Sequence, residues 1–433
     1  MPLILRGARG VGKTYAVKEL AKSFDNFVEV NFEFEGSVLK SIFEKDLDPA
    51  RIIRDLSVKY KIEISEGKTL LFFDEIQEVP IAITALRYFY EKMPNLHVIA
   101  AGSLLDFAID EVGIPVGRVE FLYMYPLSFL EFLVADGFKI AAQEILNHDI
   151  ETLMSPSTHS LLLNKLAEYL AIGGMPKVVN FWLEKNVQQC FKIQSTILDA
   201  YKQDFGEYAK KHQIRYLEEI FNSVPLQLGS KFKYSKVGEY RKRELEPCIS
   251  LLEKARVINK VIYSSGQGFP IGFQANLDDF KLIFLDVGLS QSILGLDVSQ
   301  WLINPDKEFV NKGSLVEAFI GQEMLSYSDF IKKAQLYYWH RDTRSSEAEI
   351  DYIIQSLDSI VPIEIKSGEG RTLRSMHIFL ETHSDAKYGI KLSTNNFSLL
   401  KVENKVIYNL PLYSVFKLFI YKNEIKSAIE SLF

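Results

Sequence analysis

Residues 7–14 constrain the fold more than any other stretch of this chain. They read Gly-Ala-Arg-Gly-Val-Gly-Lys-Thr and fit the pattern G-x-x-x-x-G-K-[ST], the phosphate-binding P-loop. The apolar run at 2–5 predicts a buried parallel strand before the loop. Apolar side chains four residues apart at 16, 20 and 24 predict a helix after it. A strand, a glycine loop and a helix N-terminus together make an anion site.

The pattern gives each residue of this loop an expected role in holding a nucleotide. The glycines allow the backbone N–H groups to converge on an anion. Lys13 is expected to act in catalysis by neutralising the β- and γ-phosphates, and the Thr14 hydroxyl is expected to ligate Mg²⁺. The alternative is a glycine-rich turn that fits the pattern by chance. The predicted nucleotide-binding residues of the loop are Gly7, Ala8, Arg9, Gly10, Val11, Gly12, Lys13 and Thr14.

A second apolar run, at 69–75, ends in the carboxylates Asp74 and Glu75. Such a run suits a central parallel strand, and ligands bind at the carboxyl ends of strands in open α/β sheets. Asp74 is expected to hold Mg²⁺, and Glu75 to polarise the water that attacks the γ-phosphate. With the P-loop, this strand completes the two halves of one Mg·ATP site.

A third buried strand is predicted at 96–103 and ends at Ser103. Two interpretations of Ser103 are open. It lies where such ATPases place a group that senses the γ-phosphate, which would make it a nucleotide-binding residue. It also suits the N-cap of a helix predicted at 104–109.

Composition narrows the class of protein. The 433 residues are too many for one ordinary core, so several domains are expected. No apolar run approaches a membrane span, and the P-loop begins where a signal peptide would lie. Two cysteines fit a reducing cytosol, so a cytoplasmic protein without membrane contact is predicted. The net charge is −6, yet residues 202–260 carry 13 Lys and Arg against 8 Asp and Glu.

One longer phrase resembles a known family. Gly117 and Arg118 precede Tyr-Pro-Leu-Ser-Phe-Leu-Glu-Phe at 125–132. With the P-loop and the Asp-Glu-Ile-Gln at 74–77, this phrase resembles the AAA-type P-loop ATPases of bacteria and archaea that carry a C-terminal domain of unknown function. The resemblance implies that Arg118 is a catalytic arginine finger or γ-phosphate sensor, and the alternative is a salt bridge to a local carboxylate. Family members usually have a segment before the first strand, so the adenine contacts are not assigned here.

The basic interval suggests a winged helix-turn-helix. Helices are expected at 214–224, 234–240 and 248–255, with strands at 257–263 and 269–273. The resemblance implies the same module. Two interpretations of this module are open. In the first, it binds duplex DNA. In the second, it is a packing module with a solvated basic face, and the partner is a protein. The candidate DNA contacts are Lys231, Lys233, Lys236, Arg241, Lys242 and Arg243.

The C-terminal part resembles the PD-(D/E)xK restriction-endonuclease-like core. Asp351 lies on one predicted strand, and Glu364-Ile-Lys366 on the next places both charged side chains on one face. The resemblance implies that Asp351 and Glu364 bind Mg²⁺, that Lys366 positions water, and that Glu317 on a preceding helix completes the site. An inherited fold with an exposed charged strand is the alternative.

The sequence therefore predicts an α/β chain of four modules. They are a P-loop NTPase parallel sheet at 1–138, a helical connector at 139–205, a winged helix at 206–305 and a restriction-endonuclease-like α/β module at 306–433. The first functional hypothesis is a Mg-dependent ATPase that acts as a nucleotide switch for the attached modules. An ATP-gated DNA nuclease and a nucleotide-dependent DNA-binding or scaffold protein are the alternatives.

Overall fold

The computed structural model describes residues 1–343, 346–356, 359–367, 373–402 and 404–419. They form two compact units. The first unit contains residues 1–125 together with two short segments, 254–257 and 329–333. The second contains residues 126–253, 258–328 and the described chain from 334 onward.

The first unit is built on a five-stranded parallel sheet with strand order β2-β3-β4-β1-β5. Its strands are β1 Leu3–Arg6, β2 Asn26–Asn31, β3 Thr69–Asp74, β4 His97–Gly102 and β5 Glu120–Tyr123. Its helices are α1 Lys13–Ala21, α2 Phe32–Lys45, α3 Pro49–Tyr60, the 3₁₀ turn η1 Ile76–Glu78, α4 Ile81–Lys92 and α5 Leu105–Val112.

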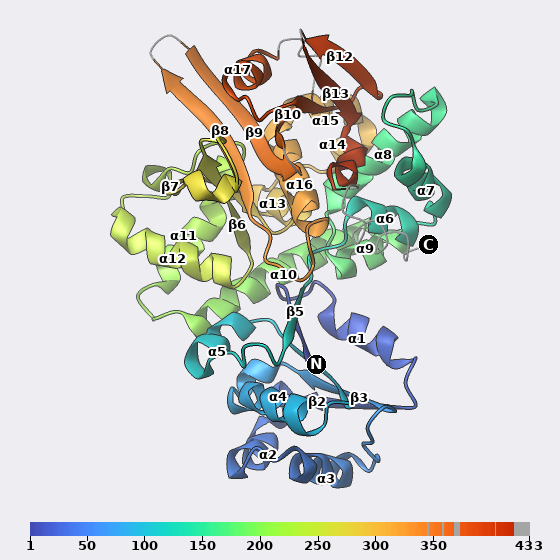
Figure 1. The fold of residues 1–433 in the computed structure, drawn as a ribbon, viewed down its shortest axis with the longest axis vertical. Coiled ribbons are helices and arrows are strands. Elements are labelled where there is room, and N and C mark those ends of the chain that lie inside the picture. The colour runs from blue at the N-terminus through green and yellow to red at the C-terminus, as the bar shows by residue number, and fades with distance from the viewer. Residues whose placement is uncertain (344–345, 357–358, 368–372, 403, 420–433) are drawn as a thin grey trace. The chain divides into compact units, whose positions relative to one another are not determined.

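Both faces of this sheet are covered, which explains why β1, β3 and β4 are largely apolar runs without alternation. All six residues of β3 are buried. One face packs against α1 through a cluster that includes Leu5, Val17 and Phe72. The other face carries the larger cluster, with side chains from α2 to α5, and Figure 1 shows α1 on the opposite side of the sheet from α2 and α3. The P-loop and the C-terminal ends of β3 and β4 lie at the same edge of this covered sheet.

The second unit is built on a mixed eight-stranded sheet with order β12-β13-β11-β10-β9-β8-β6-β7. Its strands come from both sides of residue 305, where the sequence predicted a module boundary. They are β6 Ile258–Ser264, β7 Ala275–Phe284, β8 Leu336–Thr343, β9 Ser346–Ser356, β10 Ser359–Lys366, β11 Tyr388–Ser393, β12 Ser398–Val402 and β13 Lys405–Pro411.

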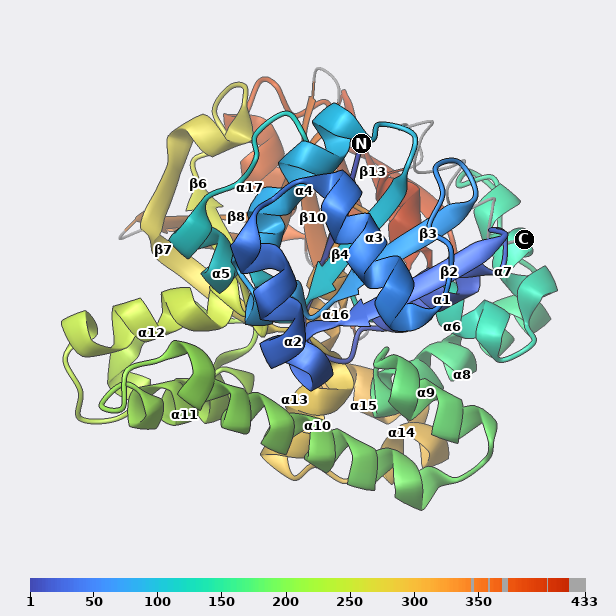
Figure 2. The same cartoon turned by 90° about the horizontal axis from the view of Figure 1, so that it is seen from below.

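In the second unit, most of the chain that precedes β6, the first strand of this sheet in sequence, is helical. The 22-residue helix α10 contacts α9 at one end and α11 at the other, as Figure 2 shows. The helix α16 packs on β7, β8 and β10, whereas α17 packs on β9, β10 and β11. The helices are α6 Phe129–Ala135, α7 Lys139–Asn147, α8 Pro156–Ile172, α9 Pro176–Leu183, α10 Val187–Tyr208, α11 Ile214–Ser223, α12 Lys242–Lys254, α13 Val287–Leu294, α14 Ser299–Ile303, α15 Pro305–Asn311, α16 Gly313–Ser326 and α17 Arg374–Thr382. The 3₁₀ turns are η2 Pro225–Gln227, η3 Tyr234–Lys236, η4 Ile271–Gln274 and η5 Leu412–Leu418.

The structure corrects two of the predicted helices. Apolar side chains four residues apart at 193, 197 and 201 predict one continuous helix over 181–208. That prediction is wrong, because α9 ends at Leu183 and Lys185 adopts a left-handed backbone with φ of 59°. The helix expected at 234–240 is also wrong. Only the short 3₁₀ turn η3 forms there, and Gly238 follows with φ of 157°. Left-handed and mirror-β residues cannot continue a right-handed helix.

Three further local predictions are wrong. The strand expected at 269–273 is instead the turn η4, and the neighbouring strand β7 begins later, at Ala275. The sequence at 307–313 suggests a linker into a helix at 314–326, but most of it forms the helix α15, which begins at a proline suited to a first helical turn. The polar residues at 340–346 predict a turn, but β8 reaches Thr343 and β9 starts at Ser346, and residues 344–345 lie outside the described part.

Candidate functional site

The P-loop joins the end of β1 to the first turn of α1. Gly12 is the N-cap of α1 and has φ of 98°, a left-handed conformation that side chains disfavour. Gly7 lies so close to β5 that an added Cβ would fall 2.5 Å from the backbone oxygen of Met124. The α1 N–H groups thus open toward the loop, which is how helix N-termini receive phosphates.

Lys13 is folded back onto its own loop. Its Nζ donates hydrogen bonds to the carbonyl oxygens of Gly7 at 2.9 Å and Ala8 at 3.0 Å. Burial lowers the pKa of Lys13 to about 8, the charges of Glu75 and Asp74 oppose that shift, and those of Arg9 and Arg256 add to it. A buried ammonium with a lowered pKa is stabilised by an arriving anion, because the anion restores the charge balance that burial removes.

Thr14 and Asp74 link the two halves of the expected Mg·ATP site. The Thr14 hydroxyl donates to Asp74 Oδ2 at 3.1 Å, across sixty residues of sequence. Burial, followed by the charge of Glu75, raises the pKa of Asp74 to about 6. Mg²⁺ prefers oxygen ligands and in nucleotide sites takes one or two protein oxygens together with phosphates, so this pair fits the ion. The described residues contain no group of three or more His, Cys, Asp or Glu that could hold a metal without a nucleotide.

Glu75 and Ser103 lie together at the edge of the same sheet. Glu75 Oε2 accepts hydrogen bonds from Gln77 Nε2 at 2.7 Å, from Ser103 N at 3.1 Å and from Ser103 Oγ at 3.2 Å. Glu75 itself has φ of 50°, a strained backbone for a residue with a side chain, and such strain clusters at functional sites. The cap interpretation of Ser103 is wrong, because α5 begins at Leu105 without a side-chain cap.

Arg118 forms a salt bridge to a local carboxylate, which is the alternative to a catalytic role that the sequence left open. Its Nε pairs with Glu91 on α4 at 3.3 Å, and Glu91 also pairs with Arg87 at 3.0 Å. The Arg118 side chain is 43% exposed. The structure brings it to a local carboxylate, and a role for it in catalysis stays a prediction.

Three residues beside the P-loop were not predicted. Arg6 directly precedes the loop, and its Nε pairs with Asp106 at 3.2 Å. The other oxygen of Asp106 pairs with Arg256 at 2.6 Å, so the carboxylate lies between two guanidinium groups. Arg6 directly follows the strand predicted at 2–5. A charged residue at the end of a buried strand indicates a charge that needs a partner. Nothing local in the sequence joins it to residue 256.

The C-terminal candidate residues also gather, although not as a metal site. Asp351 Oδ2 accepts the N–H of Ile365 at 2.7 Å, and Glu364 pairs with Lys366 at 2.8 Å. Glu317 on α16 pairs at 2.8 Å with Lys281, a lysine from β7 that the sequence did not single out. One oxygen of each candidate acid is therefore already used by a protein donor.

The basic interval is partly neutralised by neighbouring acids. Lys231 pairs with Asp279 at 2.5 Å, and Lys242 pairs with Asp278 at 2.7 Å. The other four candidate DNA contacts are exposed. Duplex DNA as a partner stays a prediction.

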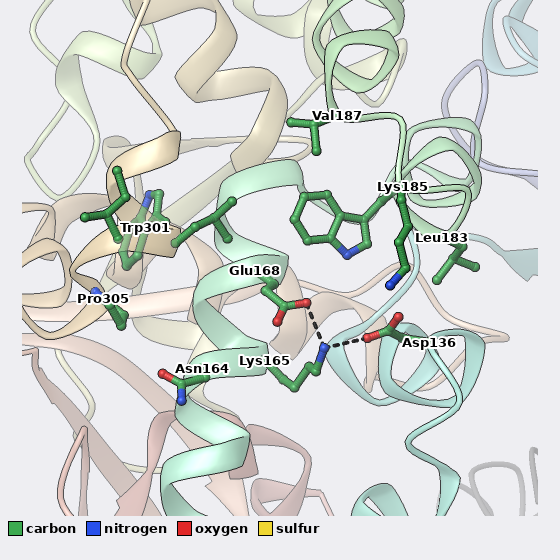
Figure 3. A pocket seen from close by; sticks show the side chains of 12 residues that line it. Asp136, Asn164, Lys165, Glu168, Leu183, Lys185, Val187, Trp301 and Pro305 are labelled. Carbon is green, nitrogen blue, oxygen red and sulfur yellow. Dashed lines mark hydrogen bonds and ion pairs between the residues drawn. The ribbon is translucent and has the colours of Figure 1, made fainter.

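A separate hollow of about 700 Å³ lies in the second unit. Figure 3 shows Lys165 pointing toward both Asp136 and Glu168, each at 2.9 Å. Lys185 also lines the hollow, so its two acids and two lysines balance in charge. It contributes nothing to the predicted nucleotide site. Among the described helices, none is long and apolar enough to cross a membrane.

The fold and the P-loop geometry define a mixed α/β protein with a P-loop domain. Residues 1–133 match the family model described as AAA domain, which confirms the expected AAA-type P-loop region. Residues 312–413 match a domain of unknown function, DUF4143, and residues 163–300 match another, DUF8612. The winged-helix and nuclease-like predictions are not confirmed by these matches.

Other comparisons add little. A Signal Transduction ATPase with Numerous Domains (STAND) protein with a tetratricopeptide repeat sensor from Pyrococcus horikoshii is similar at 12% identity and a TM-score of 0.24. The similarity covers 76% of this chain and 46% of that one. No curated protein matches the chain significantly.

Proposed function

We propose that this chain binds Mg·ATP, hydrolyses it, and acts as a nucleotide switch for its C-terminal part. The observation that carries the proposal is the hydrogen bond between Thr14 and Asp74. It joins the P-loop to the acidic strand end at the point where the two sequence patterns would share one ion. The match of residues 1–133 to an AAA domain supports the same function.

The proposed chemistry assigns one task to each residue. Lys13 leaves the carbonyl oxygens of its loop and pairs with the β- and γ-phosphates. Thr14 and Asp74 would hold Mg²⁺, which when bound would neutralise charge on these phosphates. Glu75 turns from Ser103 toward the attacking water and accepts its proton. The loop residues 7–14 hold the phosphate oxygens through their N–H groups.

The switch proposal rests on how the chain is threaded. Residues 254–257 belong to the first unit, whereas the helix α12 before them and the strand β6 after them belong largely to the second. Arg256 in this segment pairs with Asp106, which also pairs with Arg6 immediately before the P-loop. A nucleotide-dependent shift of this ion-pair group would act directly on the chain that enters β6.

We retain the four modules at 1–138, 139–205, 206–305 and 306–433 as a proposal.

ATP turnover of the purified full chain tests this function. Glu75→Gln is expected to lower turnover by about 100-fold or more while ATP binding persists, because a general base of this kind supplies about 10²–10⁴ in rate. Glu78→Gln is the matched control, since Glu78 is an exposed glutamate three residues along the chain. Equal turnover in wild type and Glu75→Gln would contradict the assignment.

The same assay, run with and without duplex DNA, separates the partners that the switch could serve. Turnover stimulated by DNA that stays intact on a gel would support a DNA-responsive switch. Cut DNA would support the nuclease alternative, which no contact in the described residues favours. ATP binding with no response to DNA would direct the search to a protein partner.

A further inference from the structure

Glu317, one of the acids expected to form the Mg²⁺ site of the C-terminal part, pairs with a buried lysine, Lys281. Lys281 comes from β7, the edge strand of the sheet, and β6 and β8 separate it from β9 in the strand order. Its side chain is only 2% exposed. Its ammonium group nevertheless reaches acids on two other elements, α16 and β9.

Lys281 makes two close ion pairs. Its Nζ lies 2.8 Å from Glu317 Oε1 on α16 and 2.5 Å from Glu349 Oε1 on β9. The ammonium also lies 5.1 Å from the ring centroid of Tyr338 on β8, within reach of a cation–π interaction. A buried charge is tolerated only when it is paired, and here acids on two elements provide that pairing.

The remaining acids of the cluster are also engaged. Asp351 Oδ2 accepts a backbone N–H at 2.7 Å, and Glu364 Oε1 lies 2.8 Å from Lys366 Nζ. Glu364 Oε2 is buried without a hydrogen-bond partner in the described part of the chain. This oxygen is where a bound metal would first be sought. A metal at Glu364 would need further oxygens from Asp351 and Glu317, and one oxygen of each already accepts a hydrogen bond, from the Ile365 N–H and from Lys281 Nζ.

The electrostatic direction agrees with the geometry. Burial alone would lower the pKa of Lys281, yet the charges of Glu317, Asp351 and Glu349 outweigh it and raise the pKa above the ordinary value. The ammonium supplies one positive charge to an acidic cluster in which a metal-dependent nuclease would hold a divalent ion.

We infer that the ammonium group of Lys281 is the resident cation of this carboxylate cluster. The cluster is an internal ion-pair network, and the Mg²⁺ implied by the nuclease-like resemblance does not fit the residues present. The C-terminal part consequently keeps the acidic pattern of a metal-dependent nuclease without its metal chemistry.

Metal binding to the full chain tests this inference without changing Lys281. The parent protein carries Lys13→Ala and Asp74→Asn, so that the N-terminal site cannot contribute. Mn²⁺ alone is titrated, and the free ion is measured by electron paramagnetic resonance. A hollow of about 370 Å³ lined by Lys231, His340 and Glu349 leaves Glu349 open to solvent, so that ions can approach the cluster. We expect no saturable binding at millimolar Mn²⁺. Saturable binding that Asp351→Asn abolishes would overturn the inference.

A second comparison tests the lysine itself. In the same parent, Lys281→Met should lower the thermal midpoint well below that of Lys260→Met. Lys260 is a matched lysine on β6 with a single pairing to Glu253. Mn²⁺ should raise the midpoint of Lys281→Met and leave the parent unchanged. A Lys281→Met protein as stable as its parent and indifferent to Mn²⁺ would show that Lys281 is not the counter-ion of the cluster.

Discussion

At the scale of single residues, burial shifts the pKa values of two residues of the proposed nucleotide site in opposite directions. It lowers the pKa of Lys13 to about 8 and raises that of Asp74 to about 6. Both shifts have the same cause, because a buried site disfavours the charged form of either group. The site therefore has both charges in place only over a narrow range of pH before ligand arrives.

This predicts the pH dependence of Mg·ATP binding. Affinity should fall as pH rises through about 8, where Lys13 loses its proton, and as pH falls through about 6, where Asp74 gains one. Calorimetric titrations at pH 5 to 9 measure both limbs. In Lys13→Arg the alkaline limb should disappear whatever the absolute affinity, because arginine stays protonated throughout this range. The same alkaline loss in Lys13→Arg would assign it to another group.

At the scale of elements, the features that could be predicted are those with a local sequence pattern. The phrase at 125–132 contains a Ser-x-x-Glu capping box, in which Ser128 Oγ accepts the Glu131 N–H and Glu131 accepts the Ser128 N–H. The helix α6 follows directly. The contact of its N-terminus with Glu323 on α16, at 3.0 Å from Phe129 N, joins residues nearly two hundred positions apart and has no local signal.

The capping box makes a stability prediction. Ser128→Ala should destabilise the protein by about 1–2 kcal/mol, because it leaves a helix N–H unpaired at a buried site. Denaturant unfolding followed by circular dichroism measures this. Glu131→Gln is the control, since glutamine preserves the box, and it should cost clearly less. Equal losses in both variants would attribute the effect to the Glu131 charge.

The buried Glu323 predicts a stability effect with a defined sign. Burial raises the pKa of Glu323 to about 8, against hydrogen bonds from Tyr327 and Phe129 that favour its charged form. A raised acid pKa stabilises the fold fully below the unfolded value near 4.5, and this contribution is lost as pH rises through 8. Glu323→Gln should therefore gain relative to wild type by about 1.4 kcal/mol per pH unit between pH 5 and 8. A difference independent of pH, measured by unfolding at each pH, would contradict the shifted pKa.

At the scale of the whole molecule, the sequence predicted the first unit better than the second. The strands β1, β3 and β4 are largely apolar runs, which are typical of buried parallel strands, and the predicted motif residues follow their ends. In the second unit, β6 pairs with β8 in parallel, across more than seventy residues. β9 also contains one residue more than β8 between the pairs Tyr337–Ile353 and Trp339–Ile350.

The same reasoning explains what was missed at the candidate sites. The residues of the proposed nucleotide site lie at the ends of predictable strands, so residue type and spacing were enough to propose them. Asp351 was proposed from its residue type, although it lies within the irregular stretch of β9, where a bulge re-aims side chains. Lys281 reaches the acidic cluster from an edge strand, and Arg256 reaches Asp106 across 150 positions. Only the fold brings such partners together.

The binding of Mg·ATP by matched lysine variants tests the central claim most directly. Lys13 and Lys18 both lie on α1, but Lys13 is buried in the P-loop, whereas Lys18 is half exposed and pairs with Glu29. Calorimetry on the full chain should show binding by wild type and Lys18→Ala, and a loss of about 100-fold or more in Lys13→Ala, because hydrogen bonds to charged groups contribute about 1.5–3 kcal/mol each. If Lys13→Ala binds Mg·ATP as tightly as Lys18→Ala, the P-loop is not the nucleotide site and the proposed function is wrong.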